Sequence, residues 1–324
     1  MVGAPGFEPG TPASQTRCAA GLRYAPSGES IMPCMVKRQE NIVIGLLVTL
    51  LFLAGCAPKL PPPDPTRIPS TPIPTLIPTK AVATSSPTPE PCLDATGQVD
   101  TGTFTSDFLP EYYIYFPKCY FADESTHYPV LYLLHGQTYT AEQWLDLGVA
   151  EHAAALMDAG EIPPFLIVMP LDRLSWDLVE NDPFGDVFID EFIDYIDAEY
   201  RTLAEPEFRA LGGLSRGAGW TIRKGLQNWQ LFGALGIHSP AIFQRDASKL
   251  DDWLRAIPVD EMPLIFFDIG DRDTGLADAL RFADLLAQEG IVHEWHLYAG
   301  WHDDEYWQAH VEEYLRWYGA FFDN

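Results

Sequence analysis

One pentapeptide, residues 213–217, constrains the fold of this 324-residue chain more than any other stretch. It reads Gly-Leu-Ser-Arg-Gly and ends a short apolar run, 208–214. The Gly-x-Ser-x-Gly spacing is typical of a sharp turn from a strand into a helix, where a side chain on either flank would collide with its neighbours. Such a turn lifts the Ser215 hydroxyl clear of the sheet, beside the positive end of the helix. Ordinary tight loops share the spacing, so its meaning depends on the residues that follow.

A serine hydroxyl is a poor nucleophile unless a histidine takes its proton and a carboxylate orients that histidine. His302 follows the last expected strand and is the expected base, whereas His238, at the end of an earlier strand, is a weaker alternative. Asp271 and Asp273 lie just after the strand expected at 264–269, where open α/β sheets build their sites. Either aspartate could instead cap the helix that starts there, so the residues alone leave the acid open.

Strands and helices alternate along residues 103–322, which predicts the α/β class, with a mostly parallel central sheet and helices on both faces. The apolar runs at 128–134 and 164–170 are continuous, as expected for strands buried on both faces. The segment 186–201 places its apolar side chains on one stripe and predicts an amphipathic helix. We also expect a first strand at 103–105 and helices at 141–159, 246–256, 273–289 and 304–322.

The start of the chain differs in character from the rest. Residues 1–34 are aperiodic and resemble the conceptual translation of a transfer-RNA gene, so we expect translation to begin at Met35 or Met32. Residues 35–55 have the charged start, apolar centre and small-residue end of a secretory signal. Their Leu-Ala-Gly-Cys ending resembles a bacterial lipobox, which implies cleavage before Cys56 and lipidation of its sulfur. An uncleaved anchor helix is the alternative.

Residues 56–91 are rich in Pro and Thr and predict an extended tether between a lipid anchor and the folded domain, residues 92–324. We therefore expect an extracytoplasmic, membrane-anchored bacterial lipoprotein. Cys92 and Cys119 are the two cysteines of the exported domain, and we expect them to form a disulfide. Two free thiols would indicate that the export signal has been misread.

Charge and ligand spacing argue against several classes of function. The chain has 46 acidic and 20 basic residues, a net charge of −26, which disfavours nucleic acid and anionic membrane faces as partners. No set of Cys and His residues has zinc spacing, and we expect neither a metal nor a cofactor. His293 and His296, three residues apart on an expected strand, would point to opposite faces.

A serine nucleophile of this kind also needs two backbone N–H groups that stabilise the oxyanion of the tetrahedral intermediate. One is the N–H of Arg216, the residue after the serine. The other is expected from the loop after the strand that ends in His-Gly, most simply the N–H of Gln137. Trp144, Trp176 and Trp301 are candidates for the pocket wall, although each could equally be a core or lid aromatic.

Taken together, four motifs resemble the putative esterase family of α/β-hydrolases, over about residues 103–321. That family includes feruloyl and acetyl xylan esterases, esterase D and the mycolyltransferases of antigen 85 type. The resemblance implies the α/β-hydrolase fold and identifies Asp273 as the acid. The chain departs from the family at Arg216, where many members carry Met, and at 218–220, where many have a Gly and a Tyr, so pocket shape and substrate stay open. The motifs are Leu134-His135-Gly136, residues 213–217, Gly270-x-x-Asp273, and Gly300-x-His302 followed by Trp307.

These residues predict a serine hydrolase that cleaves a carboxylic ester through an acyl-enzyme. Ser215 would be the nucleophile, His302 the base and Asp273 the acid. The expected substrate is a small-molecule or carbohydrate-linked ester. Two alternatives remain: an acyltransferase that uses the same triad, and a non-catalytic binding module on a lipid anchor.

Overall fold

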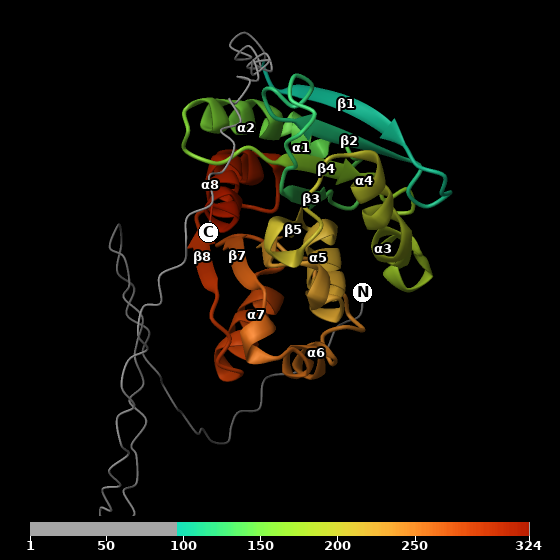
Figure 1. Cartoon of the computed structure of the whole chain (residues 1–324). Helices are drawn as coiled ribbons and strands as arrows, with labels where there is room; N and C mark the ends of the chain where they lie inside the picture. Colours follow the sequence, from blue (N-terminus) through green and yellow to red (C-terminus); the bar gives the residue numbers. More distant parts are fainter. Residues whose placement is uncertain (1–95, 324) are drawn as a thin grey trace, which may run out of the picture. The chain divides into compact units, whose positions relative to one another are not determined.

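A single eight-stranded sheet forms the centre of the structure, a computed structural model that describes residues 96–323. The strand order is β1-β2-β4-β3-β5-β6-β7-β8, visible from one side in Figure 1. β1 and β2 pair antiparallel, as do β2 and β4, and the other five pairs are parallel. The strands are β1 Gln98–Thr103, β2 Glu111–Phe116, β3 Val130–Leu134, β4 Leu166–Pro170, β5 Arg209–Leu214, β6 Ala234–His238, β7 Leu264–Gly270 and β8 Glu294–Tyr298.

Helices cover both faces of this sheet, which confirms the expected α/β class. One buried cluster joins the sheet to α1, α2 and α8, and a second joins the opposite face to α3, α4, α5, α6 and α7. The helices are α1 Gln143–Asp146, α2 Val149–Asp158, α3 Phe184–Val187, α4 Ile193–Glu199, α5 Arg216–Gln227, α6 Leu250–Ala256, α7 Leu276–Gln288 and α8 Asp304–Phe322.

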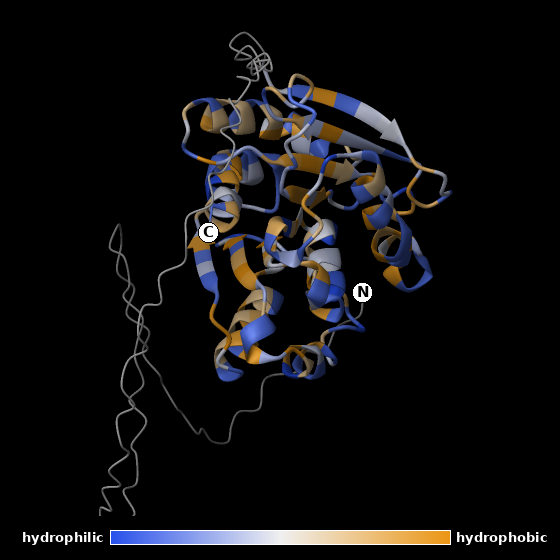
Figure 2. Ribbon diagram, in the orientation of Figure 1, coloured by the Kyte–Doolittle hydropathy of each residue, from blue (hydrophilic) through white to orange (hydrophobic). Residues whose placement is uncertain are grey.

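The central strands show why a continuous apolar run is needed here. All five residues of β3 are buried. Val130 and Tyr132 belong to the cluster under α5, whereas Leu131 and Leu133 belong to the cluster under α8, because successive side chains of a strand point to opposite faces. Figure 2 shows hydrophobic colouring along the central strands and mixed colouring on the helices.

Three elements differ from the sequence prediction. The helix expected at 186–201 is α3, a π-helical turn over Phe188–Phe192 and then α4. The extra residue in that turn brings both Phe188 and Phe192 inward against Tyr132. The segment 141–159 forms two helices instead of one, and the first strand lies at 98–103 instead of 103–105, because exposed edge positions carry little hydrophobic pattern.

Several sequence predictions fall outside the described residues. The translation start, the signal at 35–55, the Cys56 lipid site, the tether at 56–91 and Cys92 all lie there. The Cys92–Cys119 disulfide therefore stays a prediction. Between residues 96 and 323, no helix is both long and apolar enough to cross a membrane.

Candidate active site

Ser215 occupies the turn between β5 and α5 in a conformation that L-residues rarely adopt, with φ 53° and ψ −115°. Its two flanking glycines are required by close packing. A Cβ on Gly213 would lie 2.4 Å from the carbonyl carbon of Gly217, and a Cβ on Gly217 would lie 2.1 Å from the carbonyl oxygen of Leu134. The turn is also fixed by hydrogen bonds from the Ser215 N–H to the His238 carbonyl and from the Ala241 N–H to the Ser215 carbonyl.

His302 lies between Ser215 and Asp273, although the three come from loops far apart in the sequence. Its Nε2 is 2.8 Å from Ser215 Oγ, and its Nδ1 is 2.7 Å from Asp273 Oδ2. The Asp273 side chain is fully buried, and its other oxygen accepts a hydrogen bond from the Gly275 N–H at 2.7 Å. The carboxylate can therefore fix the imidazole with Nδ1 protonated, which leaves Nε2 free to accept the serine proton.

The loops that carry Asp273 and His302 touch each other directly. A Cβ on Gly270 would lie 2.5 Å from the Gly300 carbonyl oxygen, so the approach requires glycine. Asp271 joins the same loops in a different way, since its Oδ1 accepts the Gly300 N–H at 3.0 Å. Asp271 thus supports the histidine loop without facing His302, and Asp273 is the aspartate that contacts the imidazole.

Helix α8 fixes the position of His302 from the other side. Asp303 caps the N-terminus of the helix, and its side chain accepts the Tyr306 N–H at 3.0 Å. This cap fixes where the helix begins and so restricts the position of His302, the preceding residue. The buried Trp307 ring meets the His302 ring edge-on, with centroids 5.0 Å apart.

The loop after β3 lies against the nucleophile. A Cβ on Gly136 would be 3.5 Å from Ser215 Cβ, and the next residue, Gln137, borders a cavity that Arg216 also borders. The Arg216 N–H is in the first turn of α5, where N–H groups have no partner within the helix. This placement agrees with the predicted pair of oxyanion donors, whose roles stay predictions.

Sequence reasoning missed the residue that holds this loop. Gln143, buried at the start of α1, accepts the Gly136 N–H with its Oε1 at 2.8 Å and donates from its Nε2 to Asp304 at 3.2 Å. It therefore connects the Gln137 loop to the beginning of the helix that follows His302. No local pattern marks this role, because its two partners lie 7 and 161 residues away.

His135 and Asp172 form a second connection in the same region. The Asp172 N–H donates to His135 Nε2 at 2.9 Å, and His135 Nδ1 donates to the Gly136 carbonyl at 2.8 Å. Burial lowers the pKa of His135 to about 4, so the ring stays neutral, as this donor and acceptor pattern requires. The histidine is a structural part of the loop.

His238, the alternative base, cannot serve Ser215 as a base. Its side chain is fully buried; Nδ1 lies 2.7 Å from Asp268 Oδ1, and Nε2 accepts from the Tyr318 hydroxyl at 3.1 Å. Asp268 Oδ2 also accepts the hydroxyls of Tyr306 and Tyr314, at 2.5 and 2.8 Å. We call these five residues the buried histidine network.

The three tryptophans have different environments. Trp144 is 1% exposed, lies in the core cluster under α2 and α8 and donates to the Leu134 carbonyl at 3.1 Å. It is a core aromatic, and its assignment to the pocket wall is wrong because the core needs its large apolar ring there. Trp176 and Trp301 are 70% and 54% exposed, and the Arg272 guanidinium lies over the Trp301 ring. Their pocket role stays a prediction.

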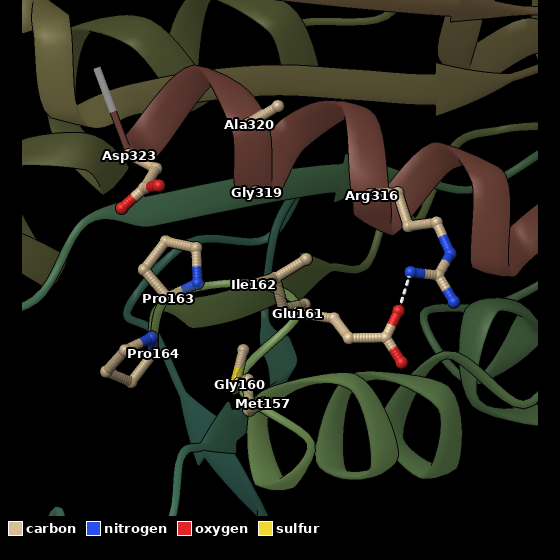
Figure 3. A pocket seen from close by; sticks show the side chains of 10 residues that line it. All are labelled: Met157, Gly160, Glu161, Ile162, Pro163, Pro164, Arg316, Gly319, Ala320 and Asp323. Carbon is tan, nitrogen blue, oxygen red and sulfur yellow. Dashed lines mark hydrogen bonds and ion pairs between the residues drawn. The ribbon is translucent and has the colours of Figure 1, made fainter.

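Cavity size alone does not identify the site. A cavity of about 430 Å³ lies between the end of α2, the segment leading into β4 and the end of α8 (Figure 3). It contains the Arg316–Glu161 ion pair, but its lining includes no Ser, Cys or His. A smaller cavity of about 270 Å³ is bordered by Arg216, the residue after Ser215, and we call it the elbow pocket. Its lining residues are Gln137, Asp177, Leu178, Val179, Glu180, Arg216, Ala241, Ile242, Phe243 and Gln244.

The site offers no cluster for a metal ion. Among the described residues, no group of three or more His, Cys, Asp or Glu side chains is arranged to hold one. The groups that meet at the site are a hydroxyl, an imidazole and a carboxylate.

Comparison with known proteins identifies the family of the chain. Residues 110–318 match the family described as "Putative esterase". A curated relative, an endo-1,4-beta-xylanase/feruloyl esterase of Xylanibacter ruminicola, is 30% identical over 191 residues, which are 52% of this chain and 24% of the relative. The chain thus aligns with about a quarter of that longer protein.

Solved structures show the same fold. A ferulic acid esterase superposes with a TM-score of 0.63 at 25% identity, covering 71% of this chain and 100% of that one. The S-formylglutathione hydrolase of Staphylococcus aureus superposes with a TM-score of 0.57 at 17% identity, covering 69% of this chain and 96% of that one, and shows the shared fold alone. The family match spans well over half of the chain, so this protein belongs to the putative esterase family of α/β-hydrolases.

Proposed function

We propose that this protein is a carboxylic ester hydrolase in which Ser215, His302 and Asp273 form the catalytic triad. The observation that carries the proposal is the position of His302, with Nε2 at 2.8 Å from the serine hydroxyl and Nδ1 at 2.7 Å from the carboxylate. A histidine with both ring nitrogens so engaged can take the hydroxyl proton while its charged form is stabilised. The strained backbone at Ser215 supports the same assignment, because such strain is concentrated at functional sites.

The reaction then runs in two halves. Ser215 Oγ attacks the ester carbonyl as its proton passes to His302 Nε2, and the N–H groups of Gln137 and Arg216 stabilise the oxyanion that forms. His302 returns the proton to the leaving alcohol, which gives the acyl-enzyme. Water, deprotonated by His302, then attacks the acyl carbon, and the collapse of the second tetrahedral intermediate releases the acid and restores Ser215.

For the substrate we propose an ester of a hydroxycinnamic acid with a carbohydrate. The support comes from two proteins to which this chain is 30% and 25% identical, both named for ferulic acid or feruloyl esters. The fold by itself does not select this substrate, because an S-formylglutathione hydrolase shares it. A lipid anchor at Cys56 and a Cys92–Cys119 disulfide complete the proposal, which places the enzyme on the outer side of a membrane; mass spectrometry of the native protein tests both modifications.

Active-site labelling tests the triad. The full-length protein should react with a fluorophosphonate probe, and Ser215→Ala should abolish both labelling and hydrolysis of 4-nitrophenyl acetate, a loss of at least about 10⁴-fold. A panel of acetyl, butanoyl and feruloyl esters then identifies the acyl group. Wild-type turnover by Ser215→Ala would overturn the proposal and favour the non-catalytic alternative.

The two aspartates give a matched internal comparison. Asp273→Asn should lower kcat by roughly 10³–10⁴-fold, because the amide stabilises the wrong tautomer of His302. Asp271→Asn should retain most activity, because an amide oxygen can still accept the Gly300 N–H. The reverse result would show that the acid is misassigned while leaving the nucleophile in place.

A further inference from the structure

The side chain of Arg216 points away from the serine and into the protein. It is 6% exposed, and all three of its hydrogen-bonding groups are used. Nε donates to Asp172 Oδ2 at 3.1 Å, one Nη to the Asp177 carbonyl at 3.0 Å, and the other Nη to Asp182 Oδ2 at 2.5 Å. Arg216 follows the proposed nucleophile directly, and its rigid, planar guanidinium thus binds three residues of one segment.

That segment, residues 171–183, forms one wall of the elbow pocket. Four successive residues, 177–180, border the cavity, and in the sequence they lie between Asp172 and Asp182, the two carboxylates that Arg216 binds. Apart from a single 3₁₀ turn at Val179–Asn181, the segment has no regular structure of its own. Its position therefore depends on side-chain contacts with the rest of the domain.

Asp182 is the distal anchor of this wall. Its side chain has no exposed surface; Oδ2 accepts from Arg216, and Oδ1 accepts the Phe184 N–H at the start of α3 at 3.0 Å. Asp172 is the proximal anchor, where Oδ2 also accepts the Trp220 indole N–H at 3.1 Å. We propose that Asp182, through its buried bond to Arg216, is a positioning residue that sets the width of the elbow pocket and so the ester substituent that the enzyme accepts. This inference rests on the proposed triad and adds the element that selects its substrate.

The charges in this cluster do not balance. Two carboxylates, Asp172 and Asp182, face one guanidinium, and Asp172 Oδ1 is buried without a hydrogen-bond partner among the described residues. The other groups packed here, the Trp220 indole and the neutral His135, add no positive charge. Burial, followed by the charge of Asp172, raises the pKa of Asp182 to about 6.

The stability of the anchored wall depends on pH, because Asp182 has a different pKa in the anchored and the detached state. A detached, solvated Asp182 loses its proton near its ordinary pKa of 3.8, whereas the anchored group keeps it up to about pH 6. The anchored wall is therefore most stable at low pH, loses stability as the pH rises from about 4 to about 6, and changes little above that.

Selectivity between two esters of the same alcohol tests the proposal. In the full-length protein, Asp182→Ala should lower kcat/KM for 4-nitrophenyl ferulate about tenfold more than for 4-nitrophenyl acetate. The effect should be mainly on KM, because a displaced wall loses contacts with the larger acyl group that the ground state and the transition state share. Asp182→Asn keeps the side-chain shape and one acceptor oxygen, but its amide nitrogen cannot accept the second hydrogen bond, so the ratio should be only partly restored. Asp186→Ala is the matched control, since Asp186 is a nearby exposed carboxylate that does not border the pocket and pairs with Lys224 on α5, the helix that also carries Arg216.

The pH profile separates this role from a purely structural one. We compare the ratio of kcat/KM for the ferulate ester to kcat/KM for the acetate ester. Any pH effect of the triad changes both values alike and drops out of this ratio. In the wild type it should fall between pH 4 and 6 and then level off, whereas in Asp182→Asn it should stay flat. Equal loss of both esters in Asp182→Ala, or an unchanged ratio, would overturn the proposal. Labelling by the fluorophosphonate probe in every Asp182 variant shows that the triad itself is intact, so a failed pocket proposal is distinguishable from a failed triad.

Discussion

Two histidines in this molecule have the same immediate partner and opposite surroundings. His302 and His238 each place Nδ1 2.7 Å from an aspartate oxygen. The Nε2 of His302 faces a serine, and its side chain is 30% exposed; the Nε2 of His238 faces the Tyr318 hydroxyl, and its side chain has no exposed surface. A His–Asp pair is thus not in itself a catalytic feature. Such a pair can act in catalysis only where the second ring nitrogen of the histidine faces a nucleophile that a substrate can reach.

The contrast extends to the carboxylates. Asp273 accepts from His302 and from one backbone N–H, whereas Asp268 accepts from His238 and from the hydroxyls of Tyr306 and Tyr314. The buried histidine network joins β6, β7 and α8, so it fixes the helix that begins two residues after His302. We infer that the first pair performs the chemistry and the second supports the scaffold around it.

The largest expected effect is on activity and comes from removing His302, from the pair that we propose to be catalytic. His302→Ala should reduce hydrolysis of 4-nitrophenyl acetate by at least about 10⁴-fold with little change in Tm, because members of a triad act as a unit. Steady-state assays and thermal melts on the same sample check both parts. A large fall in Tm with residual turnover close to wild type would mean that the two histidines had been assigned to the wrong roles.

A smaller but distinct effect is expected from the other pair. Asp268→Asn should lower the free energy of unfolding by about 3 kcal/mol, because it leaves His238 and two buried hydroxyls with a weaker acceptor. For a domain of this size each kcal/mol corresponds to a fall in Tm of about 2–4 °C. Activity measured well below the new Tm should stay within about threefold of wild type. Loss of activity in a folded variant would show that the network takes part in catalysis.

The smallest effect concerns alkaline pH. Burial raises the pKa of Tyr318 well above its ordinary value of 10, so the folded protein keeps a proton that the unfolded chain releases above pH 10. The unfolded state then binds fewer protons, and stability falls as the pH rises. Tyr318→Phe should reduce that slope by up to about 1.4 kcal/mol per pH unit, at a cost of about 1 kcal/mol at neutral pH. Denaturant titrations between pH 9 and 11 measure the slope, and an unchanged slope would argue against suppressed ionisation of Tyr318.

Local patterns predicted the central strands and the serine turn well. The strands from β3 to β7 are continuous apolar runs, and α8 spans the predicted residues 304–322. The order of Ser215, Asp273 and His302 follows from the chemistry of the turn together with the resemblance to a family. The choice between Asp271 and Asp273 did not follow from spacing alone, since both come after the same strand.

Long-range polar contacts outside the predicted triad could not be predicted. Arg216 reaches Asp172 and Asp182 across 44 and 34 residues, and the His238 pair spans 30. Buried polar contacts between distant positions have no sequence periodicity, unlike a stripe of apolar residues on a helix. For the same reason the sequence indicates for Arg216 only a backbone N–H donor and a departure from the family. The contacts of its side chain with the segment 171–183 become visible only in the fold.

The backbone at Ser215 has a consequence for how such a chain evolves. A positive φ at a residue with a side chain costs about 1–3 kcal/mol, and glycine at the same position would not bear that cost. Selection for stability alone would therefore favour glycine at this one position, and the change would abolish the proposed nucleophile in a single step. Retention of serine in a lineage is then a direct record of selection for turnover, whereas descendants that have lost their activity should drift towards glycine at 215 before other positions of the site.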